Sequence, residues 1–257
     1  MVIRLKPDAV PYCITTARKI PLALKQKVKD ELDDMVRKGV IERVGDRTTE
    51  WCHPLVVVSK PNGDVRITVD LTKLNSQVQR TIHNSPSPAE IVADRRPNAK
   101  YWTTLDAKSG YWQVPLSEES RDLTVFLCCF GKYRYKRSPM GFISSGDSYC
   151  YRGDIAPEGI EHVRKIVDDI IAEDEDLKEH FDRVCSVLER CRKYRITINP
   201  RKFAFGQAKV KFAGYVISRD GIGADPDKVR AIAEFPTPTN PTEVRSFMGI
   251  VQQLGQF

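Results

Sequence analysis

The chain has 257 residues, of which 41% are apolar and 29% are charged, which is enough apolar side chains for one sizeable core or two adjoining cores. Its longest aliphatic run, Leu55–Val58, is far shorter than the roughly 18 apolar residues that cross a bilayer, so the composition excludes a membrane-spanning protein. The net charge of +7 favours a polyanionic partner, of which nucleic acid is the commonest.

The seven cysteines form no CxxC motif, and none lies at zinc-binding spacing from the four histidines. An odd number of cysteines without such a pattern predicts a reducing compartment. The chain does not open with a charged segment followed by an apolar stretch, so we expect no secretory signal and a cytoplasmic or nuclear location.

Apolar residues recur at helical spacing over residues 21–38, and Gly39 stands where a helix would end, so the pattern predicts an amphipathic helix. Two β-rich runs follow, at residues 55–58 and 65–69. They flank the turn sequence Pro61-Asn62-Gly63-Asp64. Such runs around an Asn-Gly pair predict a β-hairpin.

The middle of the chain alternates short apolar runs with polar, proline-containing segments. Residues 91–93 predict a short helix. Residues 101–105 predict a strand that ends at Asp106. A further strand is expected at residues 125–130, with residues 133–135 pairing back across a glycine.

The last third predicts a long helix over about 177–195, with Asp174 or Asp176 placed to cap it. Its expected apolar stripe comprises Leu177, Phe181, Val184, Val187, Leu188 and Cys191. Residues 209–218 predict one strand, and the chain from 221 onward predicts helices punctuated by prolines. These elements form a mixed α+β pattern without the β-α-β alternation of a doubly wound sheet.

Two adjacent acids, Asp168 and Asp169, lie inside the apolar run Ile166–Ile171. Such a pair is costly, because desolvation and mutual repulsion both disfavour the two ionised groups. One interpretation is a tight hairpin whose tip exposes both acids to water. The run of acids from 173 to 176 is interpreted separately, as the solvated start of the following helix, and the four histidines are assigned no chemistry.

Asp106 favours a different interpretation of the acid pair. It ends an apolar strand and precedes the small residues Ala107, Ser109 and Gly110. Mg²⁺ is held by a few carboxylates together with substrate phosphates, and two such ions about 4 Å apart can stabilise an in-line phosphoryl displacement. Three acids on two neighbouring strands would meet that requirement.

Several further segments carry distinctive motifs: KGVIERV (38–44), CHPLVVVSKPNGDVRITVDLTKLN (52–75), YWTTLDAKSGYWQV (101–114), SPMGF (138–142), IVDD (166–169), FAGYVISRDGIGADPDKV (212–229) and EVRSFMGI (243–250). In order, and over nearly the whole length of the chain, these segments resemble the reverse transcriptase domain of gypsy-type LTR retrotransposons. The resemblance implies a right-hand polymerase with an antiparallel palm sheet. Fingers are expected at 1–84 and 114–143, palm at 85–113 and 144–220, and a partial thumb at 221–257.

The resemblance also implies an RNA-directed DNA polymerase that transfers a dNMP from a dNTP to a primer 3′-OH, on a duplex of primer with RNA or DNA template, with no membrane partner. Asp106, Asp168 and Asp169 match the triad that binds two Mg²⁺ or Mn²⁺ ions, and Ala107 would add its backbone carbonyl. Lys202 resembles the residue proposed to protonate pyrophosphate. From the residues alone, Lys202 remains equally open to having no such role.

Further residues match the family's nucleotide and primer contacts. Lys60 and Arg66 would hold the triphosphate, Ser109 and Gly110 would offer backbone N–H groups, and Tyr111 would exclude a ribose 2′-OH. The remaining matches are Met140 and Gly141 near nucleotide and template, and Phe212, Gly214 and Tyr215 as primer grip. As alternatives, Arg66 is an ordinary surface cation, Tyr111 a core residue, and Phe212 and Tyr215 the filling of a sheet face.

The chain departs from the family pattern in three places. Ile166 replaces the usual tyrosine before the acid pair, residues 144–150 replace a template-side motif, and the chain ends inside the expected thumb. A shortened thumb is expected to weaken the grip on duplex. Two rival hypotheses therefore stay open: a retroelement relic that binds nucleic acid or protein without catalysis, and an RNA-dependent RNA polymerase.

Overall fold

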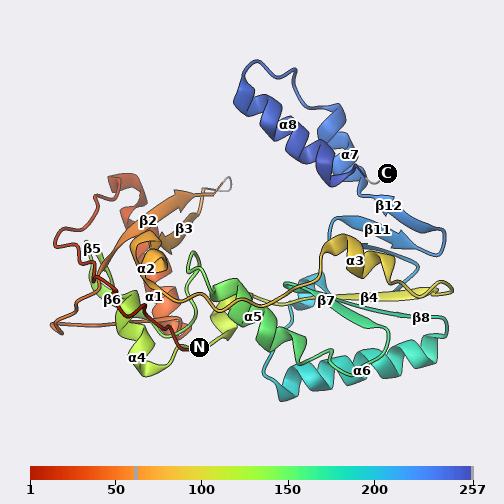
Figure 1. The fold of residues 1–257 in the computed structure, drawn as a ribbon, viewed down its shortest axis with the longest axis horizontal. Coiled ribbons are helices and arrows are strands. Elements are labelled where there is room, and N and C mark those ends of the chain that lie inside the picture. The colour runs from red at the N-terminus through yellow and green to blue at the C-terminus, as the bar shows by residue number, and fades with distance from the viewer. Residues whose placement is uncertain (61–62, 256–257) are drawn as a thin grey trace. The chain divides into compact units, whose positions relative to one another are not determined.

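The computed structural model of the chain describes residues 1–60 and 63–255 (Figure 1). The chain folds as two compact units. One consists of Met1–Asn84 with Ser109–Arg152, and the other of Ser85–Lys108 with the chain from Gly153 onward. No helix in the described part of the chain is long and apolar enough to cross a membrane.

The first unit is built on a five-stranded sheet in the order β1-β6-β5-β2-β3. Its strands are β1 (Ile41–Arg43), β2 (His53–Ser59), β3 (Val65–Val69), β5 (Phe126–Cys128) and β6 (Gly131–Tyr135). The predicted β2–β3 hairpin is confirmed, with Leu55 opposite Val69 and Ser59 opposite Val65. Pro61 and Asn62 of its expected turn lie outside the described residues. The β5–β6 pair also forms as predicted, although β5 is shorter than the expected strand.

Helix α1 (Leu22–Arg37) confirms the predicted amphipathic helix of this unit. Pro21 precedes its first turn, and Gly39 follows its end with φ +66°, a conformation that glycine adopts without steric cost. The buried face of α1 consists of Val28, Leu32 and Met35, which pack in the same core cluster as the inward residues of β2 and β3.

The remaining helices of this part are α2 (Thr72–Gln77), α4 (Glu118–Arg121) and α5 (Ser145–Asp154), with the short 3-10 turns η1 (Gly110–Gln113) and η2 (Asp122–Thr124). None of these was predicted from the sequence. Helix α5 has the sequence SGDSYCYRGD, which is rich in residues that favour turns over helix interiors. No local sequence pattern therefore predicts this helix.

The second unit contains a four-stranded antiparallel sheet in the order β7-β8-β4-β9. Its elements are β4 (Tyr101–Asp106), β7 (Val163–Ile166), β8 (Asp169–Asp174), β9 (Ala204–Gln207), α3 (Pro88–Ala93) and α6 (Leu177–Lys193). Apolar clusters cover both faces of this sheet. One contains Leu105, Ile170 and Val184 of α6, and the other contains Trp102 and Ile171.

The predicted single strand over 209–218 is wrong, because the segment is a hairpin of β10 (Lys209–Phe212) and β11 (Tyr215–Ser218). Ala213 and Gly214 form its turn, both with positive φ. An alanine in that conformation gives no sequence signal for a turn. The segment from 221 also begins as a strand, β12 (Gly221–Ala224), before helices α7 (Pro226–Ala233) and α8 (Pro241–Gln253).

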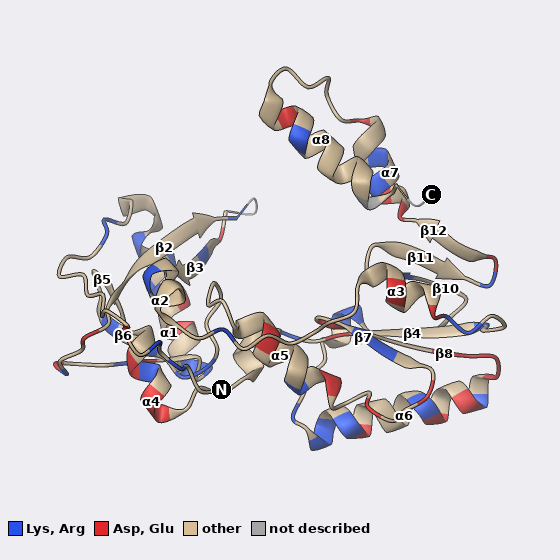
Figure 2. Ribbon diagram, viewed as in Figure 1, with Lys and Arg blue, Asp and Glu red and all other residues tan. Residues whose placement is uncertain are grey.

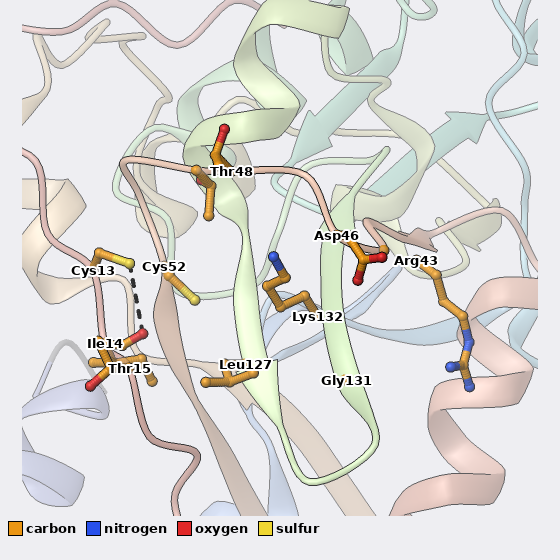
Figure 3. Close-up of a pocket in the computed structure, with 12 residues that line it drawn as sticks. Cys13, Ile14, Thr15, Arg43, Asp46, Thr48, Cys52, Leu127, Gly131 and Lys132 are labelled. Atoms are coloured by element: carbon orange, nitrogen blue, oxygen red, sulfur yellow. Dashed lines mark hydrogen bonds between the residues drawn. The ribbon is translucent and has the colours of Figure 1, made fainter.

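Helix α6 forms as predicted and is capped by Asp176, whose side chain accepts hydrogen bonds from the backbone N–H groups of Lys178 and Glu179. The buried face is His180, Val184, Val187 and Cys191, whereas Leu177, Phe181 and Leu188 of the expected stripe are exposed. Figure 2 shows acidic and basic residues mixed along α6, as on a solvated helix.

The interpretation of residues 173–176 as a solvated acidic run is wrong for its first two members. Glu173 and Asp174 end strand β8 and are fully buried. Glu173 pairs with Arg164 at 2.5 Å, and Asp174 pairs with Arg183 at 2.9 Å. Buried carboxylates require such partners, and these arginines lie outside the acidic run in sequence.

Candidate active site

The three acids singled out in the sequence come together at one end of the β4–β8 pair. Asp106, the last residue of β4, lies directly opposite Asp169, the first residue of β8. Asp168 stands in the turn between β7 and β8, and its backbone carbonyl accepts a hydrogen bond of 2.8 Å from the N–H of Ala107. The strand register thus gathers carboxylates that are more than 60 positions apart in the sequence.

The β7–β8 turn is tight and strained. Ile166 pairs with Asp169, so Val167 and Asp168 alone form the connection. Val167 has φ +47°, a left-handed conformation that a β-branched residue adopts at a cost. Asp168 and Asp169 are both half-buried, so the interpretation of a tip with two acids in open water is wrong, although the hairpin itself is present.

Burial and a neighbouring negative charge disfavour the ionised form of Asp169. Burial raises the pKa of Asp169, and the neighbouring carboxylate of Asp106 raises it further, while the ammonium of Lys202 acts in the opposite direction. Two like charges at close range disfavour joint ionisation. A cation at this end of the sheet would relieve that repulsion.

Lys202 already supplies one positive charge. It ends the 3-10 turn η3 (Pro200–Lys202), and its Nζ lies 2.8 Å from Oδ1 of Asp106. This hydrogen bond raises the pKa of Lys202. The structure therefore brings Lys202 to the acids.

Asn199 also contacts Asp106, and the sequence reasoning missed it. Its backbone N–H donates to the Asp106 carbonyl at 2.7 Å, and its Nδ2 lies 3.5 Å from Oδ2 of the same residue. The Asn199 side chain also caps η3 by accepting from the N–H of Arg201. The Asn-Pro pair at 199–200 is a signal for such a cap and could have revealed it.

The acids at this sheet end carry the donor chemistry of a metal site. Carboxylate and carbonyl oxygens are the donors that Mg²⁺ and Mn²⁺ take in proteins, and the crowded negative charge around Asp169 suits a divalent cation. Within residues 1–60 and 63–255, no group of three or more His, Cys, Asp or Glu side chains is gathered closely enough to hold a metal ion. The donor types and charge fit the ion, while one oxygen of Asp106 is engaged by Lys202.

The residues resembling a primer grip lie at the β10–β11 turn of the same unit. Phe212 and Tyr215 face each other across this turn and are 2% and 9% exposed, in the same core cluster as Trp102. Gly214 has φ +86°, and a Cβ there would collide with the Lys228 side chain. The two aromatic residues thus fill a sheet face, which was the alternative interpretation of them.

The expected triphosphate contacts Lys60 and Arg66 belong to the first unit, on the β2–β3 hairpin, and both are exposed. Arg66 is opposite Val58, and the N–H of Lys60 donates to the carbonyl of Asp64. The two cations are therefore diagonal neighbours rather than directly opposite each other, and that spacing is within reach of long side chains.

Ser109, Gly110 and Tyr111 begin the η1 turn of the first unit, with Ser109 in a left-handed conformation at φ +52°. The half-buried ring of Tyr111 packs edge-on against Tyr149 of α5, with centroids 6.0 Å apart. Tyr111 therefore has both a core contact and a partly exposed surface.

Met140 and Gly141 lie in a loop that Asn75 holds from the end of α2. Asn75 Nδ2 donates to the Gly141 carbonyl at 2.9 Å, and its Oδ1 accepts from the N–H of Ile143 at 3.0 Å. One amide side chain thus satisfies two backbone groups of this loop. Asn75 was not predicted as a functional residue, although it closes the matching segment 52–75.

Comparison with known proteins shows which family the chain resembles. Residues 58–217 match the family model "Reverse transcriptase (RNA-dependent DNA polymerase)". The retrovirus-related Pol polyprotein from transposon opus of Drosophila melanogaster is 33% identical over 245 residues, covering 92% of this chain and 24% of the relative. The corresponding polyprotein from transposon gypsy of the same species is 32% identical, covering 87% of this chain and 22% of the relative. The chain spans about a quarter of the length of these curated relatives.

Solved structures show the same fold. The foamy viral protease-reverse transcriptase in complex with double-stranded DNA has a TM-score of 0.84 at 22% identity, covering 98% of this chain and 45% of that chain. The same kind of viral protein in complex with an RNA/DNA hybrid has a TM-score of 0.82 at 22% identity, covering 97% and 34%. The predicted right-hand polymerase architecture is therefore confirmed. Divalent metal ions are the general cofactors of proteins with this domain. The family model matches residues 58–217, which is more than half of the chain, so the chain belongs to the reverse transcriptase family.

Proposed function

We propose that this chain is an RNA-directed DNA polymerase of a gypsy-type retrotransposon, which transfers a dNMP from a dNTP to a primer 3′-OH. The observation that supports this most directly is the register that sets Asp106 opposite Asp169, with Asp168 in the adjoining turn. Three oxygen-donor side chains at one sheet end are the arrangement that metal-assisted phosphoryl transfer requires.

In this proposal Asp106, Asp168 and Asp169, with the backbone carbonyl of Ala107, hold two Mg²⁺ or Mn²⁺ ions. When bound, such ions lower the pKa of the attacking hydroxyl and neutralise the leaving pyrophosphate. The chain's part is to fix the carboxylate positions. The β4–β8 register does so for Asp106 and Asp169, and the two-residue β7–β8 turn does so for Asp168.

Lys202 is proposed to protonate the leaving pyrophosphate. The side chain is an ammonium at neutral pH and has a proton to give. Its hydrogen bond to Asp106 raises its pKa and holds that proton, so release requires that this hydrogen bond be broken. In the step itself the primer 3′-OH gives up its proton to water and its oxygen forms a bond to the α-phosphorus. The bond from that phosphorus to the pyrophosphate oxygen breaks, and the proton passes from Nζ to the oxygen that leaves.

The first unit supplies the proposed nucleotide contacts. The exposed cations Lys60 and Arg66 suit a triphosphate. The turn beginning at Ser109 and Gly110 offers backbone N–H groups, and Tyr111 limits room at the sugar so that a 2′-OH is excluded. Met140 and Gly141 are proposed to pack near the nucleotide and template.

The similar foamy viral structures are complexes with double-stranded DNA and with an RNA/DNA hybrid. We propose that this chain binds the corresponding duplex of primer with RNA or DNA template. Phe212, Gly214 and Tyr215 position the primer end through the backbone of their turn, since both aromatic rings are buried. Fingers are proposed at 1–84 and 114–143, palm at 85–113 and 144–220, and thumb residues at 221–257.

Primer extension tests the proposal. The chain is incubated with a homopolymeric RNA template, a complementary DNA primer, the matching dNTP and Mg²⁺ or Mn²⁺. We expect extension by the native chain and none by Asp168→Asn, which keeps the shape of the side chain and removes its charge. Extension that survives the substitution would refute the metal assignment. Binding of template–primer without any extension would favour the catalytically inert relic.

A further inference from the structure

A buried polar network lies on the α6 side of the sheet in the second unit. The hydroxyl of Thr103 on β4 lies 2.6 Å from Nε2 of His180 on α6, and Nδ1 of His180 lies 2.9 Å from Oδ2 of Asp174 on β8. All three residues are 0% exposed. The N–H of Gly206 on β9 donates to the same Thr103 hydroxyl at 3.0 Å. One network therefore joins three strands and a helix.

The direction of the bonds at His180 follows from its Asp174 neighbour. Nδ1 faces a carboxylate and so carries a proton, and in the neutral ring Nε2 then accepts the proton of the Thr103 hydroxyl, whose oxygen accepts from Gly206. The Nδ1–H of His180 then donates to Asp174, whose carboxylate also accepts from Nε of Arg183 at 2.9 and 3.1 Å. These hydrogen bonds form together only when β4 and β8 pair in the observed register.

The apolar residues around the network specify that register weakly. On β8, Ile170 and Ala172 pack in the cluster on the α6 side, and Ile171 packs in the cluster on the opposite face. A strand with apolar residues on both faces can slip by one position and still bury apolar side chains. Buried polar groups do not tolerate such a slip, because each lost hydrogen bond leaves an unsatisfied group in the interior.

The register matters because of what lies at the end of the strands. The same pairing that sets Thr103 opposite Ala172 sets Asp106 opposite Asp169. A slip of one residue would shift one strand by roughly 3.3 Å and turn its carboxylate to the other face of the sheet. Thr103 and Asp106 are three positions apart on β4 and therefore lie on opposite faces of the sheet, so the network does not share a face with the Asp106 carboxylate.

We propose that the Thr103–His180–Asp174 network is the register lock of the β4–β8 pair, and that Thr103 and His180 are positioning residues for the carboxylates Asp106 and Asp169. That the network positions catalytic carboxylates rests on the proposed polymerase function. That it fixes the β4–β8 register does not depend on that function. Buried polar groups are known to specify register in other folds at some cost in stability.

The test uses two substitutions at one position of the full chain. Thr103→Val keeps the volume and removes the hydroxyl, whereas Thr103→Ser keeps the hydroxyl and removes a methyl group. Val184→Ala, in the α6 cluster but without a polar group, provides a matched loss of packing. Two quantities are measured: Mn²⁺ affinity by electron paramagnetic resonance, and amide hydrogen exchange in β4 and β8, each compared with the variant's free energy of unfolding.

We expect Thr103→Val to weaken Mn²⁺ binding by roughly 10–100-fold, the range for residues that orient metal ligands. We also expect faster exchange of the β8 amides in this variant. Thr103→Ser and Val184→Ala should bind Mn²⁺ as the native chain does, even where they are equally destabilised. Equal effects of all three variants, in proportion to lost stability, would overturn the lock.

The two proposals fail differently. If the native chain binds no Mn²⁺ and extends no primer, the proposed function fails, and the exchange of β8 amides alone decides on the lock. If the native chain binds Mn²⁺ and Thr103→Val matches it in both affinity and exchange, the lock fails while the polymerase assignment stands.

Discussion

The ammonium of Lys202 lies 2.8 Å from Oδ1 of Asp106, the carboxylate that ends β4. Lys202 itself is exposed, so the pair adds little to stability, of the order of 0–1 kcal/mol for such contacts. Its importance is electrostatic. The same ammonium lowers the pKa of Asp169, which burial and Asp106 raise.

Lys202→Ala should lower kcat of primer extension on the order of 100-fold, the lower range for loss of a general acid, with little change in KM for dNTP. Lys202→Arg keeps the positive charge but has a pKa too high to release a proton readily, so it should not restore kcat. Steady-state kinetics of both variants provides the check. Full recovery in the arginine variant would show that Lys202 acts by charge alone.

Asp169→Asn should make the metal-free chain more stable at neutral pH. An acid whose pKa is raised by folding binds more protons in the folded state, so the free energy of unfolding falls as pH rises through the raised pKa. Asparagine does not ionise, so the variant avoids this fall in the free energy of unfolding. Its advantage over the native chain should disappear below the ordinary pKa of aspartate. Urea unfolding at a series of pH values measures the difference, and the same pH dependence in variant and native chain would contradict the prediction. Activity should be lost in the same variant, an instance of stability given up for function.

Local sequence patterns predicted much of the secondary structure. Helix α1 lies between Pro21 and Gly39, and β4 ends at Asp106, because caps, prolines and apolar periodicity act within a few residues. The convergence of Asp106 with Asp168 and Asp169 depends on strand pairing between distant segments. The resemblance to a known family suggested that pairing, which periodicity alone did not.

The features that were missed share a physical cause, which is that distant partners decide them. Asp174 seemed a solvated acid in the sequence but is buried, since Arg183 and His180 reach it from α6. The turn at Ala213 is invisible because alanine carries no signal for positive φ. Helix α5 forms from weak helix formers, so tertiary packing overrides its local preference.

Asn75→Ala should cost about 1–3 kcal/mol of unfolding free energy, because two loop backbone groups lose their partner. If the loop bearing Met140 and Gly141 contacts the nucleotide, KM for dNTP should rise more than kcat falls. Asn75→Asp retains the bond to the Ile143 N–H but sets an oxygen against the Gly141 carbonyl, so it should not rescue KM. Unchanged kinetics at reduced stability would remove this loop from the nucleotide site.

Tyr111→Ala should admit rNTPs, since the ring is proposed to exclude the 2′-OH. Its edge-on contact with Tyr149 will also be lost, at about 0.5–1.5 kcal/mol beyond the buried area. Tyr111→Phe keeps the ring and should keep the preference for dNTP. The ratio of kcat/KM for dNTP and rNTP measures the effect. If the native chain and both variants give the same ratio, Tyr111 is a core residue only, and the rival hypothesis of an RNA-dependent RNA polymerase stands.

Val167→Asn should stabilise the β7–β8 turn. Val167 holds φ +47°, which costs a β-branched residue about 1–2 kcal/mol, whereas asparagine enters this region more readily. Because the Val167 side chain is 41% exposed, little apolar burial is lost in exchange. Urea unfolding should therefore show a gain of about 1 kcal/mol. Val167→Ile, with the same branching, is the control and should show no gain. A loss of stability in the asparagine variant would mean that contacts of the valine side chain outweigh the backbone strain. A gain in stability together with slower extension would mean that the strained turn helps to place Asp168, the acid next to it.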